Sequence, residues 1–219
     1  MPRLAPALPL LLLGLLACKD DPKPPPPPPP PPPVTDARVG GDLEQARFDE
    51  ERRPDLIVAA LGVGPGARVA DIGAGSGLLT VHLARAVRPS GKVVATDIEA
   101  AVLDILASRL AANKLSDLVE LRVVEPDTPG LEAGQYDAVL LAEVDHYFTD
   151  PVAWLRAAKQ ALKPGGAIAI TNRVHHRAAG LAAAKAAGLH LRSESTPMPS
   201  TFIAVFRAEP SPSPTPPPP

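Results

Sequence analysis

One stretch of the 219-residue sequence carries its strongest structural signal, Val69-Ala70-Asp71-Ile72-Gly73-Ala74-Gly75-Ser76-Gly77. A short apolar run, typical of a buried strand, is followed by three glycines at alternate positions. Glycine lets the backbone turn sharply and lets a ligand approach the main chain without a Cβ in between. The stretch therefore predicts a junction of strand, loop and helix, at which a nucleotide-like ligand binds beside the strand end.

Strand-like patterns recur along the chain, from this junction to its carboxyl side. Short apolar runs predict seven strands, over residues 68–72, 92–96, 118–124, 136–142, 167–171, 189–195 and 201–207. Helical patterns separate most of them, which predicts an α/β fold with a doubly wound, mostly parallel seven-stranded sheet. The last two strands have no helix between them, so we expect them to run antiparallel to each other.

Apolar residues at helical spacing predict the helices of this fold. They cover residues 43–61, in two pieces around Pro54, and then residues 79–87, 102–110, 151–163 and 177–187. Asp150 followed by Pro151 is typical of an N-cap and a first helical position. The helix that they begin is expected to run to Lys163 and to end at the turn 164–166.

Proline separates one folded section from its appendages. Of the 30 prolines, ten form the run Pro24–Pro33 and seven lie between Pro210 and Pro219. Such runs favour a polyproline II rod over a core, so residues 18–41 are interpreted as a disordered tether and residues 208–219 as a disordered tail. A spacer role is preferred to an SH3-type ligand role, which nothing beyond the prolines supports. Residues 42–207 remain as one domain, long enough to bury a core.

Residues 1–17 resemble the signal peptide of a bacterial lipoprotein. Arg3 supplies a positive charge, an apolar run extends from Leu8 to Leu16, and Ala17 and Cys18 follow. The run is too short to cross a bilayer as a helix. In such signals the cysteine is lipidated and becomes the new amino terminus, so Cys18 is expected to anchor the protein to a membrane. The alternative is an ordinary secretory signal with a cysteine there by chance.

Two acids flank the glycine loop. Asp71 precedes it, and Asp97 follows the second predicted strand. A carboxylate at Asp71 would repel a pyrophosphate but attract a ligand with sulfonium and ammonium groups, whereas one at Asp97 can accept both ribose hydroxyls of an adenosine. The glycines could form a tight turn that binds no ligand, and Asp97 could be an ordinary exposed acid. Each explanation is plausible by itself, but the occurrence of both features in one βαβ unit favours a ligand site. Leu78 stands where a dinucleotide loop has its third glycine, which disfavours an NAD-binding oxidoreductase.

Together, residues 71–77 and Asp97 resemble the signature of class I methyltransferases, which use S-adenosylmethionine (SAM). The resemblance continues through residues 136–141 and 162–166 and covers nearly all of residues 42–207, most closely the small single-domain bacterial members. It implies a Rossmann-like sheet in the order 3-2-1-4-5-7-6 with strand 7 antiparallel, and SAM as the cofactor.

The same resemblance implies which residues bind SAM. The methionine part would lie on the glycines of the loop, Gly73, Gly75 and Gly77. Asp97 would hold the ribose, and an acid after the third strand would lie near the adenine amino group. Glu125 or Asp127 can fill this last place, and the spacing does not decide between them. Asp71, and Glu143 directly after the fourth strand, complete the expected cofactor-binding set.

The sequence is less specific about the methyl acceptor. Methyl transfer needs an oriented acceptor and a group that takes its proton, and Asp145 or His146, after the fourth strand, can serve as that catalytic base. The alternative for His146 is a structural role at the following helix. No ligand spacing links His146 with His175 and His176, so no metal site is expected.

A small-molecule acceptor is the remaining expectation. The formal charge of −2 gives no basic surface for nucleic acid, and the Asn-Pro-Pro-Tyr motif of nucleic-acid amino methyltransferases is absent. We therefore expect a SAM-dependent methyltransferase on a lipid anchor at the periplasmic or extracellular face. Because SAM is made in the cytoplasm, a catalytically silent SAM- or nucleoside-binding module and a cytoplasmic enzyme with a misread signal stay as alternatives.

Overall fold

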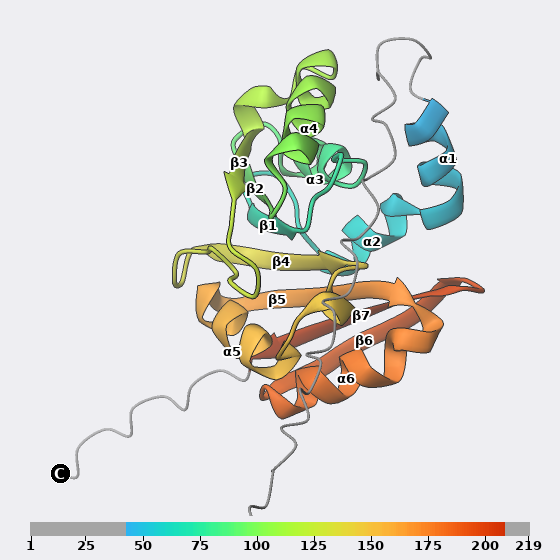
Figure 1. Cartoon of the computed structure of the whole chain (residues 1–219), viewed down its shortest axis with the longest axis vertical. Helices are drawn as coiled ribbons and strands as arrows, with labels where there is room; N and C mark the ends of the chain where they lie inside the picture. Colours follow the sequence, from blue (N-terminus) through green and yellow to red (C-terminus); the bar gives the residue numbers. More distant parts are fainter. Residues whose placement is uncertain (1–42, 209–219) are drawn as a thin grey trace, which may run out of the picture. The chain divides into compact units, whose positions relative to one another are not determined.

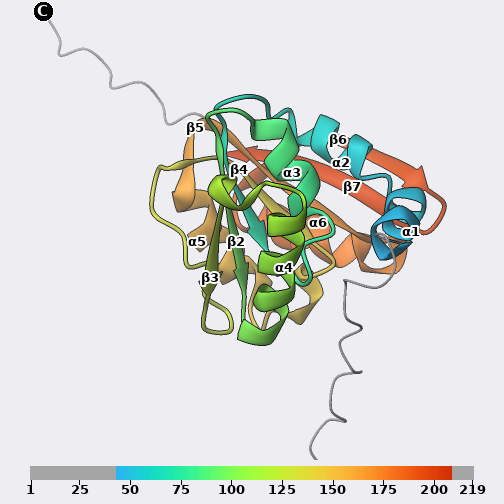
Figure 2. The same cartoon turned by 90° about the horizontal axis from the view of Figure 1, so that it is seen from above.

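The computed structural model describes residues 43–208, and its central element is one sheet with the strand order β3-β2-β1-β4-β5-β7-β6. The strands are β1 (Arg68–Ile72), β2 (Lys92–Asp97), β3 (Val119–Val123), β4 (Tyr136–Ala142), β5 (Leu162–Arg173), β6 (Leu189–Met198) and β7 (Thr201–Ala208). Figures 1 and 2 show β3 and β6 at the two opposite edges. The strands from β3 to β5 pair in parallel, whereas β7 is antiparallel to both of its neighbours. The predicted fold class and strand order are confirmed.

Six helices of the described residues cover the sheet, α1 (Leu43–Arg52), α2 (Pro54–Leu61), α3 (Thr80–Val87), α4 (Ala100–Ala112), α5 (Pro151–Ala161) and α6 (Arg177–Ala186). Figure 1 shows α3 and α4 on one face of the sheet and α5 and α6 on the other. No helix between residues 43 and 208 combines the length and the apolar character that a membrane span requires.

Strand residues alternate between two separate hydrophobic cores because successive side chains of a strand point to opposite faces. Val69 and Leu140 pack in the core beneath α2, α3 and α4. Ala70 and Leu141, their neighbours in sequence, pack in the core beneath α5 and α6. Central strands buried on both faces explain why their sequences are apolar without interruption.

The start of α5 confirms the N-cap expected at Asp150, whereas its end differs from the prediction. The Asp150 carboxylate accepts from the backbone N–H of Ala153 at 2.9 Å. The helix stops at Ala161 rather than at Lys163, and the carbonyl groups of Gln160 and Ala161 accept from the N–H groups of the turn that precedes β4. Leu162 is already extended and pairs with Tyr136, so β5 begins before the glycines that were expected to precede it.

Replacing this N-cap tests how much it holds α5 in place. Asp150→Ala removes the hydrogen bond to Ala153, and we expect the free energy of unfolding to fall by about 1 kcal/mol. The measurement is equilibrium denaturation in urea. Asp104→Ala, which removes the same charge from the exposed face of α4, should change stability by less than about 0.5 kcal/mol. Equal effects of the two substitutions would contradict the capping role.

Candidate functional site

The glycine loop between β1 and α3 has the geometry that its sequence predicts. All three glycines have positive φ, at 63° for Gly73, 54° for Gly75 and 84° for Gly77. A Cβ on Gly77 would lie 2.0 Å from Cδ1 of Leu106, so α4 packs directly on the loop backbone. No other residue type allows both this conformation and this approach.

Two cavities adjoin the loop at the carboxyl ends of β1, β2 and β4. The larger, of about 500 Å³, is lined by the ends of β2 and β4 and by the segments that follow β3 and β4. The smaller, of about 220 Å³, lies between the loop and α1. Gly73, Ala142 and Glu143 line both. We call them the large and the small cavity. Their shared walls place them side by side along the loop.

Asp97 fastens the loop to the end of β2. Its Oδ2 accepts from the N–H of Gly75 at 2.9 Å, and its Oδ1 accepts from the N–H of Glu99 at 3.1 Å. The side chain is half-buried and lines the large cavity. A carboxylate has about four acceptor positions, so Asp97 can hold the loop and still accept hydrogen bonds from a ligand. The sequence placed Asp97 at the site but did not show its structural role.

Asp71 lies inside β1 and lines the small cavity. It is 2 % exposed, and Oγ1 of Thr80 donates to its Oδ2 at 2.7 Å. The pKa of the Asp71 carboxyl is raised to about 6, because burial, helped by the negative charge of Asp97, raises it more than the Thr80 hydrogen bond lowers it. A buried acid without a counter-charge is costly. The free-energy cost of burying the Asp71 carboxylate falls when a cation binds beside it.

The two acids expected near the adenine group both line the large cavity. They are exposed, but their surroundings differ. Oδ1 of Asp127 accepts from the N–H of Thr149 at 2.8 Å, a hydrogen bond that lowers the pKa of Asp127. Glu125 has no side-chain hydrogen bond or ion pair with any residue between 43 and 208. The Glu125 carboxylate is therefore free to bind a ligand, whereas the Asp127 carboxylate is used to hold the loop at Thr149.

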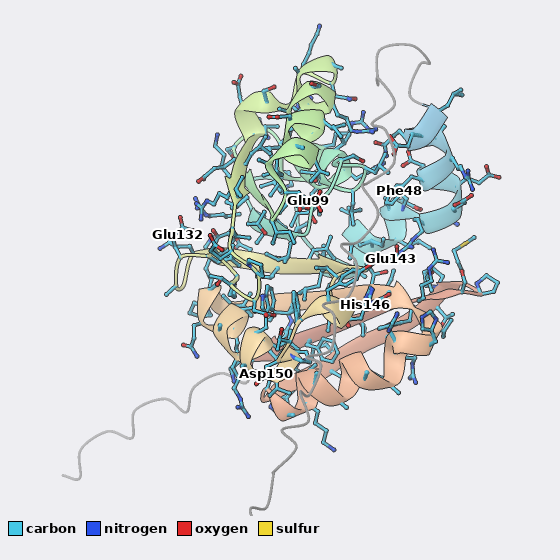
Figure 3. All side chains as sticks on the ribbon, in the orientation of Figure 1. Phe48, Glu99, Glu132, Glu143, His146 and Asp150 are labelled. Atoms are coloured by element: carbon cyan, nitrogen blue, oxygen red, sulfur yellow. The ribbon has the colours of Figure 1, made fainter. Side chains whose placement is uncertain are left out.

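Glu143 sits where the two cavities meet and carries a positive φ of 55°. Its Oε1 accepts from Nη1 of Arg52 on α1 and lies 3.3 Å from Nε of Arg173 at the end of β5. Nε of Arg52 is buried with no partner among the described residues. Figure 3 shows Glu143 at the end of β4, below Phe48 of α1. Arg52 and Phe48 line the small cavity.

The sequence did not indicate Arg52 and Phe48 as site residues. Each stands in a helix that precedes the glycine loop, and no local motif marks either of them. They reach the site because α1 packs near the loop, which is a property of the tertiary structure. A positive side chain on a helix ahead of the loop was the only available signal.

The two candidate bases are joined by a third side chain, Asn172 of β5, which is fully buried. Its Nδ2 lies 2.6 Å from Oδ1 of Asp145 and 2.9 Å from Nδ1 of His146. Its Oδ1 accepts from the N–H of Arg173 at 2.7 Å, which fixes Nδ2 as the donor in both contacts. Nδ1 of His146 therefore accepts, and the neutral ring carries its proton on Nε2.

Burial raises the pKa of the Asp145 carboxyl, and the Asn172 hydrogen bond lowers it. Asp145 is 6 % exposed, whereas His146 is exposed and its ring stacks on His176 at 4.2 Å. The histidines meet through their ring faces instead of converging on one point. No group of three or more His, Cys, Asp and Glu between residues 43 and 208 is placed to hold a metal ion.

Comparison with known proteins agrees with this geometry. Residues 70–168 match the protein family described as a methyltransferase domain. A SAM-dependent methyltransferase from Aquifex aeolicus superposes with a TM-score of 0.67, at 21% identity, over 73% of this chain and 91% of that one. The chain has the class I methyltransferase fold. A SAM-dependent O-methyltransferase from Thermotoga maritima superposes on this chain with a TM-score of 0.61, at 22% identity, over 74% of this chain and 67% of that one.

Curated relatives match a shorter part of this chain. The ubiquinone biosynthesis O-methyltransferase of Xanthomonas campestris pv. campestris is 35% identical over 117 residues, which are 53% of this chain and 46% of that protein. The ubiquinone/menaquinone biosynthesis C-methyltransferase of Hahella chejuensis is 34% identical over 50% of this chain and 44% of that protein. The chain thus spans about half the length of the curated relatives it matches.

The buried carboxyl of Asp71 predicts a pH-dependent stability of the folded domain. Because the pKa of Asp71 is higher in the folded protein than in the unfolded chain, the folded state binds more protons between about pH 4 and pH 6, and this group lowers stability as the pH rises through that window. Asp71→Asn keeps an acceptor for Thr80 and removes the charge. We expect it to be more stable than the wild type by on the order of 2 kcal/mol near pH 7, and equally stable near pH 4.

Denaturation of both proteins across this pH range measures the effect. The exposed acid Asp117 provides the control, and Asp117→Asn should give a difference from the wild type that stays constant with pH. An Asp71→Asn protein that is less stable near pH 7 would contradict the destabilising burial of this carboxyl.

Proposed function

We propose that the protein binds SAM and transfers its methyl group to a small-molecule acceptor. The observation that carries the proposal is the pair of joined cavities along the glycine loop, because their charges match the two ends of SAM. The large cavity offers Asp97 and Glu125 to an adenosine, and the small cavity offers groups of both signs to an amino acid. The match of residues 70–168 to the methyltransferase-domain family supports the same reading.

The small cavity fits the methionine part of SAM in charge. Asp71, buried without a counter-charge, would face the sulfonium or ammonium group and would be stabilised by it. Arg52 has a buried Nε without a partner among the described residues, and a carboxylate is the group that a guanidinium best accommodates. A dinucleotide would bring a pyrophosphate towards Asp71 instead, so NAD fits this cavity poorly.

SAM, when bound, supplies a methyl group on a positively charged sulfur. The residues of this chain orient the acceptor and receive its proton. Asp145 is the better candidate for the proton, since its carboxylate is buried and its pKa is raised towards the range of an effective base. His146 accepts at Nδ1 from Asn172, so it presents a donor at Nε2 and is suited to hold an acceptor oxygen.

Binding by the full-length protein tests the cofactor. Isothermal titration should show binding of SAM and of its demethylated product, and none of NAD at the same concentrations. Asp97→Ala should weaken SAM binding by about 30- to 150-fold, because charge-assisted hydrogen bonds to the ribose are lost. Since Asp97 also holds Gly75 and Glu99, the same change should lower stability by about 1–2 kcal/mol.

Asp117→Ala, in the turn before β3, controls for the loss of one charge and should leave the affinity unchanged. NAD binding as tight as that of SAM would overturn the cofactor assignment. SAM binding without turnover over a broad set of small acceptors would favour a silent binding module.

We further propose that Cys18 carries a lipid that anchors the domain at the periplasmic or extracellular face of a membrane. The support is the sequence pattern of residues 1–18 alone, which lies outside the described residues, as does the expected tether. The expected tail also lies outside them except for Ala208, which the structure places at the end of β7 and not in a disordered tail. The wild-type protein is expected in the membrane fraction, labelled by a radioactive fatty acid, and Cys18→Ser is expected to stay unprocessed or to become soluble. A cleaved protein without a lipid would indicate an ordinary secretory signal, and an uncleaved soluble wild type a cytoplasmic enzyme.

A further inference from the structure

A third cavity, of about 280 Å³, lies between α5 and α6 on the carboxyl side of β4 and β5. We call it the α5–α6 chamber. Its apolar walls include Phe148, Leu155 and Ile170, and its polar side chains are Asp145, His146 and His176. An apolar cavity of about 150 Å³ already admits benzene, so the chamber has room for a single substituted ring.

The Asp145 carboxylate directs one free oxygen into this chamber. Its Oδ1 is taken by Asn172, whereas no other residue between 43 and 208 donates to Oδ2. Oδ2 faces Gly180 of α6, where an added Cβ would lie 3.1 Å away. Gly180 therefore leaves open the space beside a carboxylate that is 94 % buried (6 % exposed). Such an oxygen needs a donor, and the chamber side of α6 offers none.

His146 gives the chamber a donor and a flat wall. Because Asn172 donates to Nδ1, the proton of the neutral ring is on Nε2. The ring stacks on His176 with an interplanar angle of 15°. A flat stack of this kind favours an aromatic ligand in offset or edge contact. The chamber thus combines a planar wall with one acceptor and one donor.

A hydroxyl group matches this pair better than an ammonium group does. A hydroxyl donates to a carboxylate and accepts from an imidazole N–H at the same time, whereas an ammonium group only donates. The chamber also adjoins the large cavity, because Phe148 lines both. Figure 3 shows Glu143 and His146 close together after β4, so one short segment serves both cavities.

We propose that the α5–α6 chamber binds a single aromatic ring that carries a hydroxyl group, with the hydroxyl donating to Oδ2 of Asp145. In calling this molecule the methyl acceptor, the inference rests on the proposed function. The position of the chamber beside the cofactor cavity, its size and its two polar groups all favour a phenol over an aliphatic chain or a cation.

The test measures binding of phenol, anisole and benzylamine to the full-length protein by saturation-transfer NMR, with the demethylated product of SAM present. Phenol should bind about tenfold more tightly than anisole, the effect of one charge-assisted hydrogen bond. Asp145→Asn turns the free acceptor into a donor and should abolish this preference while the fold persists. Preference for benzylamine, or equal binding of all three probes, would overturn the proposal.

A matched pair of substitutions on α6 distinguishes an effect on the chamber from a general effect on the helix. Ala179 is exposed and lines the chamber, and Ala182 is exposed on the same helix outside it. Ala179→Leu should reduce phenol binding at least tenfold, and Ala182→Leu should leave it unchanged. SAM titration of each variant runs in parallel. SAM binding without phenol binding in the wild type overturns the chamber alone, whereas phenol binding without SAM binding overturns the methyltransferase function and leaves the chamber.

Discussion

The attachment of the glycine loop to the end of β2 is the contact on which the large and the small cavity depend. The N–H of Ala74 donates to the carbonyl of Thr96 at 2.9 Å, and the next N–H, that of Gly75, donates to Asp97 at the same distance. These two hydrogen bonds hold the loop against the sheet, and Leu106 of α4 packs on it from above. These contacts hold the loop backbone in place within the fold, so less conformational entropy is left to be lost when a ligand binds.

The buried charged groups of the site lower the stability of the fold. Asp71 is buried beside the loop with a hydroxyl as its hydrogen-bond partner, and no residue between 43 and 208 forms an ion pair with it. Arg52 is largely buried, and its ion pair with Glu143 leaves Nε without a partner among the described residues. Buried groups of this kind lower the stability of a fold. They persist where a ligand restores the missing contacts, and this pattern is typical of functional sites.

The six residues after β4 connect all three cavities. Glu143 lines the large and the small cavity, Asp145 lines the chamber, and Phe148 lines the chamber and the large cavity. The segment changes direction sharply, since Glu143 has a left-handed backbone and a 3₁₀ turn follows at once. A short strained segment can thus present neighbouring side chains to separate spaces, which a regular strand or helix could not do.

The sequence by itself determined the strands, the glycine loop and the acids beside it, because each rests on a local pattern, whereas the strand order followed from the resemblance to class I methyltransferases. Buried strands read as apolar runs, a tight turn requires glycine, and Asp150 caps the residues next to it. Only the tertiary structure decided the end of α5, the approach of Arg52 to Glu143, and the bridge from Asn172 to Asp145 and His146. These partners stand between 26 and 91 residues apart. Contacts at such separations follow from how helices pack on the sheet, and no short-range pattern records them.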